Sequence, residues 1–275
     1  MRPTPFGVAL AAATAVSLAF LALPIVAIFA ELTLDDLRDG LTSEVARDAL
    51  RVTAETNLVA MALILLFGTP TAYLLASRDF RGRSLLVTLV ELPLVLPPAV
   101  AGIGLLAAFG TFGLLGGTLE WLGVEIAFTA IAVILAVTFV ASPFYVRTAI
   151  AAFEAVDPDL VAASRTLGAG PGRTFARVAL PLASGGLGAG AALAFARGLG
   201  EFGATIMFAG SLQGVTQTLS LAVYQEFDVR FQNALAIGAL LVLVSALILL
   251  VVKLVPTWRR STSISITASA PSVSS

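Results

Sequence analysis

The sequence predicts an all-α polytopic membrane protein with six transmembrane helices. Of its 275 residues, 58% are hydrophobic and only 12% are charged, and the mean hydropathy is +0.99. A soluble domain carries about 25% charged residues. The shortage of charged residues in this chain is too large to be explained by a buried core. Six apolar windows are each long enough to cross about 30 Å of hydrocarbon. They cover residues 6–30, 57–76, 85–110, 127–146, 182–200 and 234–256.

The sequence contains neither cysteine nor histidine. Disulfides, thiolate nucleophiles, Ser-His-Asp triads, haem ligation and zinc sites are therefore excluded, and we expect no metal site. The formal net charge is −1, which provides no basic field to hold nucleic acid. Carboxylates, hydroxyls and arginines are the reactive groups that remain, and we expect no catalytic residues.

The first window follows Arg2, as the apolar region of a signal peptide would. It is longer than such a region, and Ile28 stands where cleavage requires a small residue. We therefore expect a retained anchor. An acidic loop follows and is expected to form a short surface helix, either as a solvated face or as a docking rim for an extracytoplasmic partner. Its acidic residues are Glu31, Asp35, Asp36, Asp39, Glu44, Asp48 and Glu55.

The basic residues predict that both termini lie in the cytoplasm. With six spans the termini share one side, and this orientation places eleven of the 16 basic residues on the cytoplasmic side, as the positive-inside rule requires. The same orientation places the polar loop at residues 147–181 in the cytoplasm. The outer loops carry four arginines, Arg38, Arg47, Arg51 and Arg230.

The third and fifth windows contain helix-disrupting residues. Irregular backbone persists in a bilayer only where protein or water surrounds it. These residues therefore predict close helix packing through small side chains, a lining of the translocation path, or both. In the third window they are Pro93, Pro97, Pro98, Gly102 and Gly104, and in the fifth Gly185, Gly186, Gly188, Gly190, Gly198, Gly200 and Gly203.

Three charged side chains fall at membrane depth. Arg197 and Glu201 are four residues apart, so they share a helix face and can pair. We favour a structural ion pair over a lone arginine aimed at a pore. Glu91 is the third charge, near the inner end of the third window.

The loop between the fourth and fifth windows carries the signals of a helical hairpin. Asp157 suits the N-cap of a helix, Pro158 its first position, and Asp159 the positive end of its dipole. Gly168 supplies the left-handed residue that ends this helix. A second helix then runs from about Gly172 into the next span.

The first hairpin helix carries small residues on its surface. Ala162, Ala163 and Ser164 would let the backbone of another protein approach closely, and Arg165 would add charge-assisted contacts. An amphipathic linker lying on the membrane surface is the alternative interpretation.

This stretch resembles the cytoplasmic coupling motif of binding-protein-dependent ABC importer permeases, EAA-x3-G-x9-I-x-LP. With Gly168 in the glycine position, Val178 takes the isoleucine position and Leu180-Pro181 completes the motif. The glutamate is absent, because the EAA position holds Ala162-Ala163-Ser164, or residues 161–163 after a shift of one. The runs LPLVLPP at 92–98 and FARGLGEFGAT at 195–205 resemble the molybdate-type permease subunit, with sulfate-type and tungstate-type permeases as close relatives.

The resemblance covers about residues 50–256 and implies the type I ABC importer permease fold, with a cytoplasmic coupling-helix hairpin between helices 4 and 5. It implies a transport subunit, not an enzyme, that works as a homodimer with an ABC ATPase and an extracytoplasmic oxyanion-binding protein. The sequence has no G-x4-GK[ST], so ATP would be bound by the partner and this chain needs no cofactor. The residues assigned to ATPase coupling are Asp157, Pro158, Asp159, Ala162, Ala163, Ser164, Arg165, Gly168, Leu180 and Pro181. Those assigned to the translocation path are Pro97, Pro98, Arg197, Glu201, Gly203 and Thr205.

The function expected from this resemblance is oxyanion import by alternating access. Molybdate is favoured through the resemblance alone, and tungstate and sulfate stay open. A secondary transporter with Glu91 and Glu201 as proton carriers is a second class, and an intramembrane enzyme using these carboxylates is a third. The expected divisions are an N-terminal helix with its acidic loop at 1–51, a permease core at 52–256 and a disordered cytoplasmic tail at 257–275.

Overall fold

The computed structural model of the chain describes residues 4–260, and its side chains through residue 250. Every regular element in this range is helical. The helices are α1 (Pro5–Ala30), α2 (Leu34–Thr42), α3 (Glu44–Ser77), α4 (Arg83–Val95), α5 (Pro98–Phe109), α6 (Gly116–Trp121), α7 (Ala130–Glu154), α8 (Pro158–Thr166), α9 (Pro171–Thr174), the π-helical turn η1 (Phe175–Ala179), α10 (Leu180–Leu199), α11 (Gly203–Ala209), α12 (Leu219–Val229) and α13 (Phe231–Arg260).

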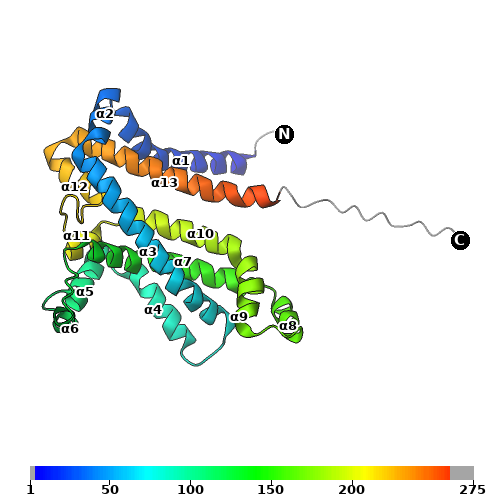
Figure 1. Cartoon of the computed structure of the whole chain (residues 1–275). Coiled ribbons are helices and arrows are strands. Elements are labelled where there is room, and N and C mark those ends of the chain that lie inside the picture. The colour runs from blue at the N-terminus through cyan, green and yellow to red at the C-terminus, as the bar shows by residue number, and fades with distance from the viewer. Residues whose placement is uncertain (1–3, 261–275) are drawn as a thin grey trace.

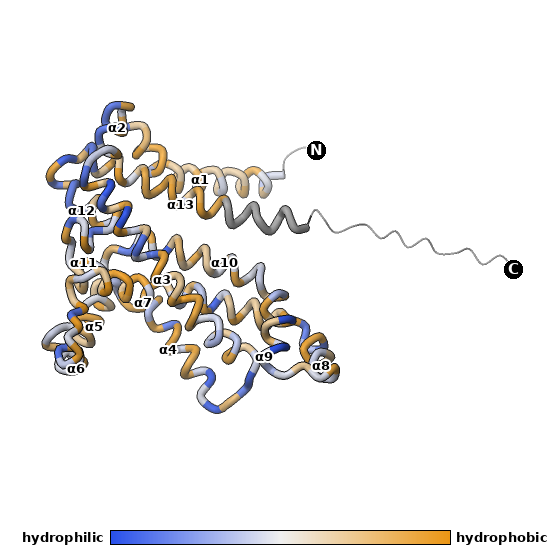
Figure 2. Tube along the Cα trace, viewed as in Figure 1, coloured by the Kyte–Doolittle hydropathy of each residue, from blue (hydrophilic) through white to orange (hydrophobic). Residues whose placement is uncertain are grey.

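The long helices form a bundle whose two ends differ (Figure 1). Five helical stretches are long and apolar enough to cross a membrane, namely α1, α3, α7, the continuous run from α9 to α10, and α13. The hairpin of α8 and α9 lies at one end of the bundle, which we call the hairpin end, and α2 and α12 lie at the opposite end. Hydrophobic residues dominate the long helices, whereas hydrophilic residues gather at both ends (Figure 2).

The third predicted span is broken into two helices, and with this pair counted as one span the described residues contain six candidate membrane spans, as expected. The chain bends by 115° between α4 and α5. The break follows from Pro97 and Pro98, which have no N–H to continue the helix and disfavour helical backbone in the residue before them. Accordingly Leu96 is extended, with φ −67° and ψ 131°. At 13 residues, α4 is about 20 Å long, too short to cross the bilayer by itself.

Two other helices extend beyond the predicted windows. α3 begins at Glu44 and ends at Ser77. It therefore runs through residue 51, the expected boundary between the N-terminal part and the permease core. α7 continues to Glu154, so Arg147 lies inside a helix and not in the polar loop to which it was assigned. In each case the hydropathy window ended at charged residues that the helix includes.

The predictions for the acidic loop and the tail have different outcomes. The short surface helix is confirmed as α2, which begins with a capping box in which Thr33 and Asp36 bond to each other's backbone N–H groups. At the other end of the chain, α13 continues to Arg260. The rest of the predicted tail, residues 261–275, lies outside the described residues.

The core forms where α7 packs between α3 and α10. Alanines allow this close approach, and Ala136, Ala141 and Ala149 on α7 are fully buried. Tyr145 is also buried, and its hydroxyl lies 2.6 Å from Thr69 Oγ1 on α3. In contrast, no residue of α1 is buried. α1 is apolar on all sides, as expected for a helix that faces lipid.

The glycines of the broken and fifth helices separate into two groups. A Cβ at Gly102, Gly186, Gly190, Gly198 or Gly203 would come within 3.0 Å of a neighbouring atom, so these positions serve close packing. A Cβ at Gly104, Gly185, Gly188 or Gly200 would meet no described atom within 4 Å. The packing interpretation therefore applies to the first group only.

Candidate functional site

The hairpin helix α8 has the ends that its sequence predicts. The Asp157 carboxylate accepts a hydrogen bond of 2.9 Å from the Asp159 N–H, and Pro158 occupies the first turn. At the other end Gly168 has φ +84°, a left-handed conformation that suits glycine. These local signals fix where the helix begins and ends.

The exposed surface of α8 includes small and apolar side chains. Ala162 and Ala163 are exposed, and the side chains around them include Leu160, which is 48% exposed, and Leu167, which is 88% exposed. Arg165 is exposed in the last turn of the same helix. A helix that presents leucines and alanines to its surroundings at one end of a bundle is suited to contact another protein.

The hairpin is joined to the bundle by side-chain contacts. Ser164 Oγ on α8 lies 3.2 Å from Oγ1 of the fully buried Thr174. The next residue, Phe175, packs against Tyr73 of α3 with tilted rings whose centroids are 4.7 Å apart. Tyr73 in turn meets Phe153 of α7 edge to face at 5.2 Å. A displacement of α8 would therefore be transmitted to α3 and α7.

The Leu180-Pro181 pair of the motif lies where the hairpin enters α10. Pro181 has no N–H to bond the carbonyl of Arg177, four residues before it. The preceding turn is a π-helix, in which the Leu180 N–H bonds to the Phe175 carbonyl. Widening of this kind accommodates a missing helical bond, so the chain runs without interruption from the hairpin into the span.

The break between α4 and α5 and the break between α10 and α11 lie in the part of the bundle away from the hairpin end (Figure 1). α10 ends at Leu199 and α11 begins at Gly203, while α5 begins at Pro98 and packs against α11. A Cβ on Gly203 would lie 2.6 Å from the Pro98 Cβ. Two interruptions of helical backbone therefore lie side by side, as they do where transporters build binding sites.

A cavity of about 110 Å³ opens beside this junction. It is lined by Arg197 from α10, by residues of α4 and α5 around the bend, and by residues of α7. The complete lining is Pro93, Leu94, Leu96, Pro98, Ala101, Val140, Phe144 and Arg197. Arg197 is the charged residue in this lining, and the other seven residues are apolar.

The predicted pair of Arg197 and Glu201 is present. The Arg197 Nη2 lies 2.7 Å from Glu201 Oε2, and the two side chains are 26% and 1% exposed. Glu201 Oε1 also accepts a hydrogen bond of 2.7 Å from the Ala204 N–H at the start of α11. Glu201 thus holds the arginine and the broken backbone together, while Arg197 still borders the cavity.

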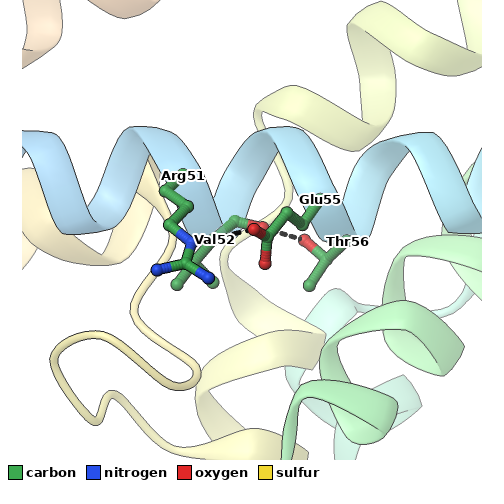
Figure 3. A network of polar contacts seen from close by, with 4 residues as sticks. All are labelled: Arg51, Val52, Glu55 and Thr56. Atoms are coloured by element: carbon green, nitrogen blue, oxygen red, sulfur yellow. Dashed lines mark hydrogen bonds and ion pairs between the residues drawn. The ribbon is translucent and has the colours of Figure 1, made fainter.

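A second arginine–glutamate pair with the same spacing lies in solvent. Arg51 Nε is 2.8 Å from Glu55 Oε1 on α3, with side chains that are 77% and 61% exposed (Figure 3). The Thr56 hydroxyl beside it donates to carbonyls of its own helix, at 2.7 Å to Val52 and 3.5 Å to Thr53. Comparing this pair with Arg197 and Glu201 isolates the effect of burial, because both pairs have i,i+4 spacing and only the second is buried.

The other residues assigned to the path occupy different positions. Pro97 is exposed at the bend, and Gly203 serves packing. Thr205 is fully buried, and its Oγ1 has no hydrogen-bond partner among the described residues. Sequence reasoning missed Val140 and Phe144, since nothing in an apolar residue's identity distinguishes a cavity lining from a lipid-facing or core position.

Gly102 tests the junction of α5 and α11. A Cβ there would lie 2.6 Å from the Ala204 carbonyl oxygen and 2.9 Å from its Cα, which are backbone atoms and cannot rotate away. We expect Gly102→Val to separate the helices, with a destabilisation of about 1–3 kcal/mol or more from overpacking. Gly104→Val, two residues along α5 where a Cβ meets open space, is the control. Unfolding in detergent should distinguish the variants, and equal midpoints would contradict the close packing.

Comparison with known proteins places the chain among transport components. Residues 64–258 match the family model described as binding-protein-dependent transport system inner membrane component. The molybdenum transport system permease protein ModB of Mycobacterium tuberculosis (strain ATCC 25618 / H37Rv) is 44% identical over 231 residues, which cover 84% of this chain and 88% of that protein. ModB of Escherichia coli (strain K12) is 42% identical over 177 residues, covering 64% and 77% respectively.

Solved structures share the fold. The bacterial alginate ABC transporter, in complex with an alginate pentasaccharide-bound periplasmic protein, gives a TM-score of 0.68 at 19% identity and covers 93% of this chain and 94% of the matched chain. The inward-facing MetNI methionine ABC transporter gives 0.59 at 21% identity, covering 77% and 94%. Together with the family match, this likeness shows the type I ABC importer permease fold.

Proposed function

The chain belongs to the family of binding-protein-dependent transport system inner membrane components, and from this premise we propose that it is the permease subunit of an ATP-driven molybdate importer. The observation that carries the choice of substrate is the 44% identity to a molybdenum permease over 84% of the chain. The chemistry of the cavity agrees with an anionic substrate, because Arg197 is the charged group on its wall.

Arg197 suits passage of an anion better than tight binding. Its charge is offset by Glu201 at 2.7 Å, so an oxyanion would be attracted weakly and released readily. A permeation site must do both. Specificity would then reside in the binding protein, and the roles of Pro97, Pro98, Arg197 and Glu201 would be to shape and charge the path.

In this proposal the hairpin end lies in the cytoplasm, together with both termini. A separate ATPase docks on α8 through Ala162, Ala163 and the exposed leucines, with Arg165 adding polar contacts. ATP is bound and hydrolysed by that partner, and this chain catalyses no reaction. The binding protein docks at the opposite end, near α2, α12 and the loop between α11 and α12.

The transport cycle follows from how the hairpin is anchored. Closure of the ATPase dimer displaces α8, and the contacts among Phe175, Tyr73 and Phe153 pass this motion to α3 and α7. Because α10 continues directly from the hairpin, Arg197 moves with it. Two copies of the chain, related by a twofold axis, would alternate between openings on each side of the membrane.

Transport assays test the proposal. The chain is to be co-expressed with an ABC ATPase and a periplasmic binding protein of a molybdate importer, purified and reconstituted into vesicles. We expect molybdate uptake that requires ATP and binding protein and persists when the proton gradient is abolished. Uptake driven by a proton gradient without ATP would overturn the proposal in favour of a secondary transporter. Retention of sulfate in preference to molybdate by the binding protein would overturn the substrate.

A further inference from the structure

A second cavity adjoins the one beside Arg197, on the side toward the hairpin end. It measures about 400 Å³ and is lined by residues of α4, α7 and α10. Leu94 and Phe144 belong to the walls of both cavities. The two cavities therefore adjoin at these two apolar side chains. The full lining of the second cavity is Leu94, Phe144, Arg147, Thr148, Ala151 and Leu193.

The two cavities follow one continuous face of α7. Val140 lines the first cavity, Phe144 lines both, and Arg147, Thr148 and Ala151 line the second. Steps of three and four residues keep these side chains on one side of a helix. Val140 and Arg147 are seven residues apart, which is about 10 Å along the axis. The face thus leads from the level of Arg197 toward the hairpin end.

The other two walls show the same progression. On α10, Leu193 lines the second cavity and Arg197, one turn further from the hairpin, lines the first. On α4, Glu91 lies three residues before the shared Leu94. Its Oε1 is 3.0 Å from Arg147 Nε, and the side chains of Arg147 and Glu91 are 59% and 37% exposed. The second cavity therefore repeats the composition of the first, with an arginine on its wall and a carboxylate beside that arginine.

We propose that Arg147 forms a second oxyanion-binding station on the hairpin side of an apolar constriction made by Leu94 and Phe144. The inference rests on the proposed function and extends it to a site with a stated ligand class, a tetrahedral divalent oxyanion. The ion pair engages Nε, which leaves the two terminal nitrogens of the guanidinium as donors. Glu91 limits the attraction, as Glu201 does for Arg197, so the anion is passed on and not retained. An apolar constriction between two polar spaces is a recognised kind of gate.

The absence of cysteine allows a direct test by thiol labelling. Thr148→Cys places a thiol in the second cavity, and anionic and cationic methanethiosulfonate reagents then report the local potential in the complex with ATPase. We expect the anionic reagent to be favoured, and Arg147→Gln to lower its rate relative to the cationic reagent by about tenfold. Arg78→Gln is the control, since Arg78 is exposed in the connection after α3.

Molybdate itself is the second probe in this experiment. It should slow labelling of Thr148→Cys by the anionic reagent when Arg147 is present and not in the Arg147→Gln background. A labelling ratio that Arg147→Gln leaves unchanged would overturn the station. If wild-type vesicles transport molybdate with ATP but Arg147→Gln leaves the anionic-to-cationic labelling ratio unchanged, the second binding station is refuted and the proposed function stands. If wild-type vesicles move no molybdate, the proposed function fails first.

A separate variant tests the proposed constriction between the two cavities. Phe144→Ala should open the barrier between the cavities, so that vesicles loaded with molybdate lose it without ATP. Phe139→Ala on the same helix is the matched control, because Phe139 packs against the core cluster of α3, α5, α7 and α11 and lines neither cavity. Equal leakage from both variants would show general damage to the bundle and would overturn the gate.

Discussion

Glu201→Ala is expected to destabilise this protein far more than Glu55→Ala, although each removes the carboxylate of an arginine–glutamate pair with i,i+4 spacing. The Glu201 side chain is 1% exposed and that of Glu55 is 61% exposed. Removing one partner of a buried pair leaves an uncompensated charge, which costs about 3–5 kcal/mol. An exposed pair such as Arg51 and Glu55 (Figure 3) is well solvated in both states, and its loss should be barely measurable.

The second contact of Glu201 adds to this effect. Its Oε1 accepts from the Ala204 N–H at the start of α11, so alanine also leaves a buried backbone donor unpaired. Glu201→Gln keeps an acceptor for Ala204 and removes the charge, and should fall between alanine and the wild type. Thermal unfolding in detergent gives the order of stabilities. Oxyanion uptake in vesicles should be lost in Glu201→Ala at temperatures where the variant stays folded, because Arg197 no longer has a fixed position beside the cavity.

The comparison with Glu55 decides whether burial or helix spacing determines how much the Glu201 ion pair stabilises the protein. If the ion pair matters through burial, the midpoint of Glu201→Ala falls well below that of Glu55→Ala. Similar midpoints would mean that helix spacing alone sets the contribution, and the description of Glu201 as the side chain that holds the junction would be wrong. Normal uptake by a stable Glu201→Ala variant would separately contradict its proposed place in the path.

Gly168→Val is expected to uncouple ATP hydrolysis from uptake. Gly168 has φ +84°, and a left-handed residue with a side chain costs about 1–2 kcal/mol, more for a β-branched one. The strain is relieved by reshaping the end of α8, which carries the exposed Leu167. The hairpin would then still bind the ATPase but transmit its motion poorly. We expect uptake per ATP hydrolysed to fall by about tenfold, within the range of typical coupling free energies.

Gly170→Val is the matched control for this change. Gly170 is also exposed in the hairpin, but it has φ −66° and ψ 165°, an extended conformation that valine adopts easily. A Cβ there would meet no described atom within 4 Å. ATPase activity and uptake are measured in the same vesicles. Uptake and hydrolysis that stay coupled in Gly168→Val, or fall equally in both variants, would contradict the role given to this turn.

Local patterns in the sequence predicted much of the fold, because they act over a few residues. Long apolar windows predicted the spans, and the N-cap at Asp157, Pro158 and the left-handed Gly168 predicted α8 with its correct ends. The spacing of Arg197 and Glu201 predicted their ion pair. Hydropathy alone misjudged α7, which continues past Arg147, because a charged residue ends an apolar window without ending a helix.

The sequence by itself determined that this protein is a helical membrane protein with a capped hairpin and a charged pair in its fifth span. Only the tertiary structure decided that the third span bends by 115°, that Glu91 meets Arg147, and that Leu94 and Phe144 line two adjoining cavities. The physical reason is that these features join helices distant in sequence. Hydropathy records how a side chain partitions between water and lipid, but not which other helix it faces.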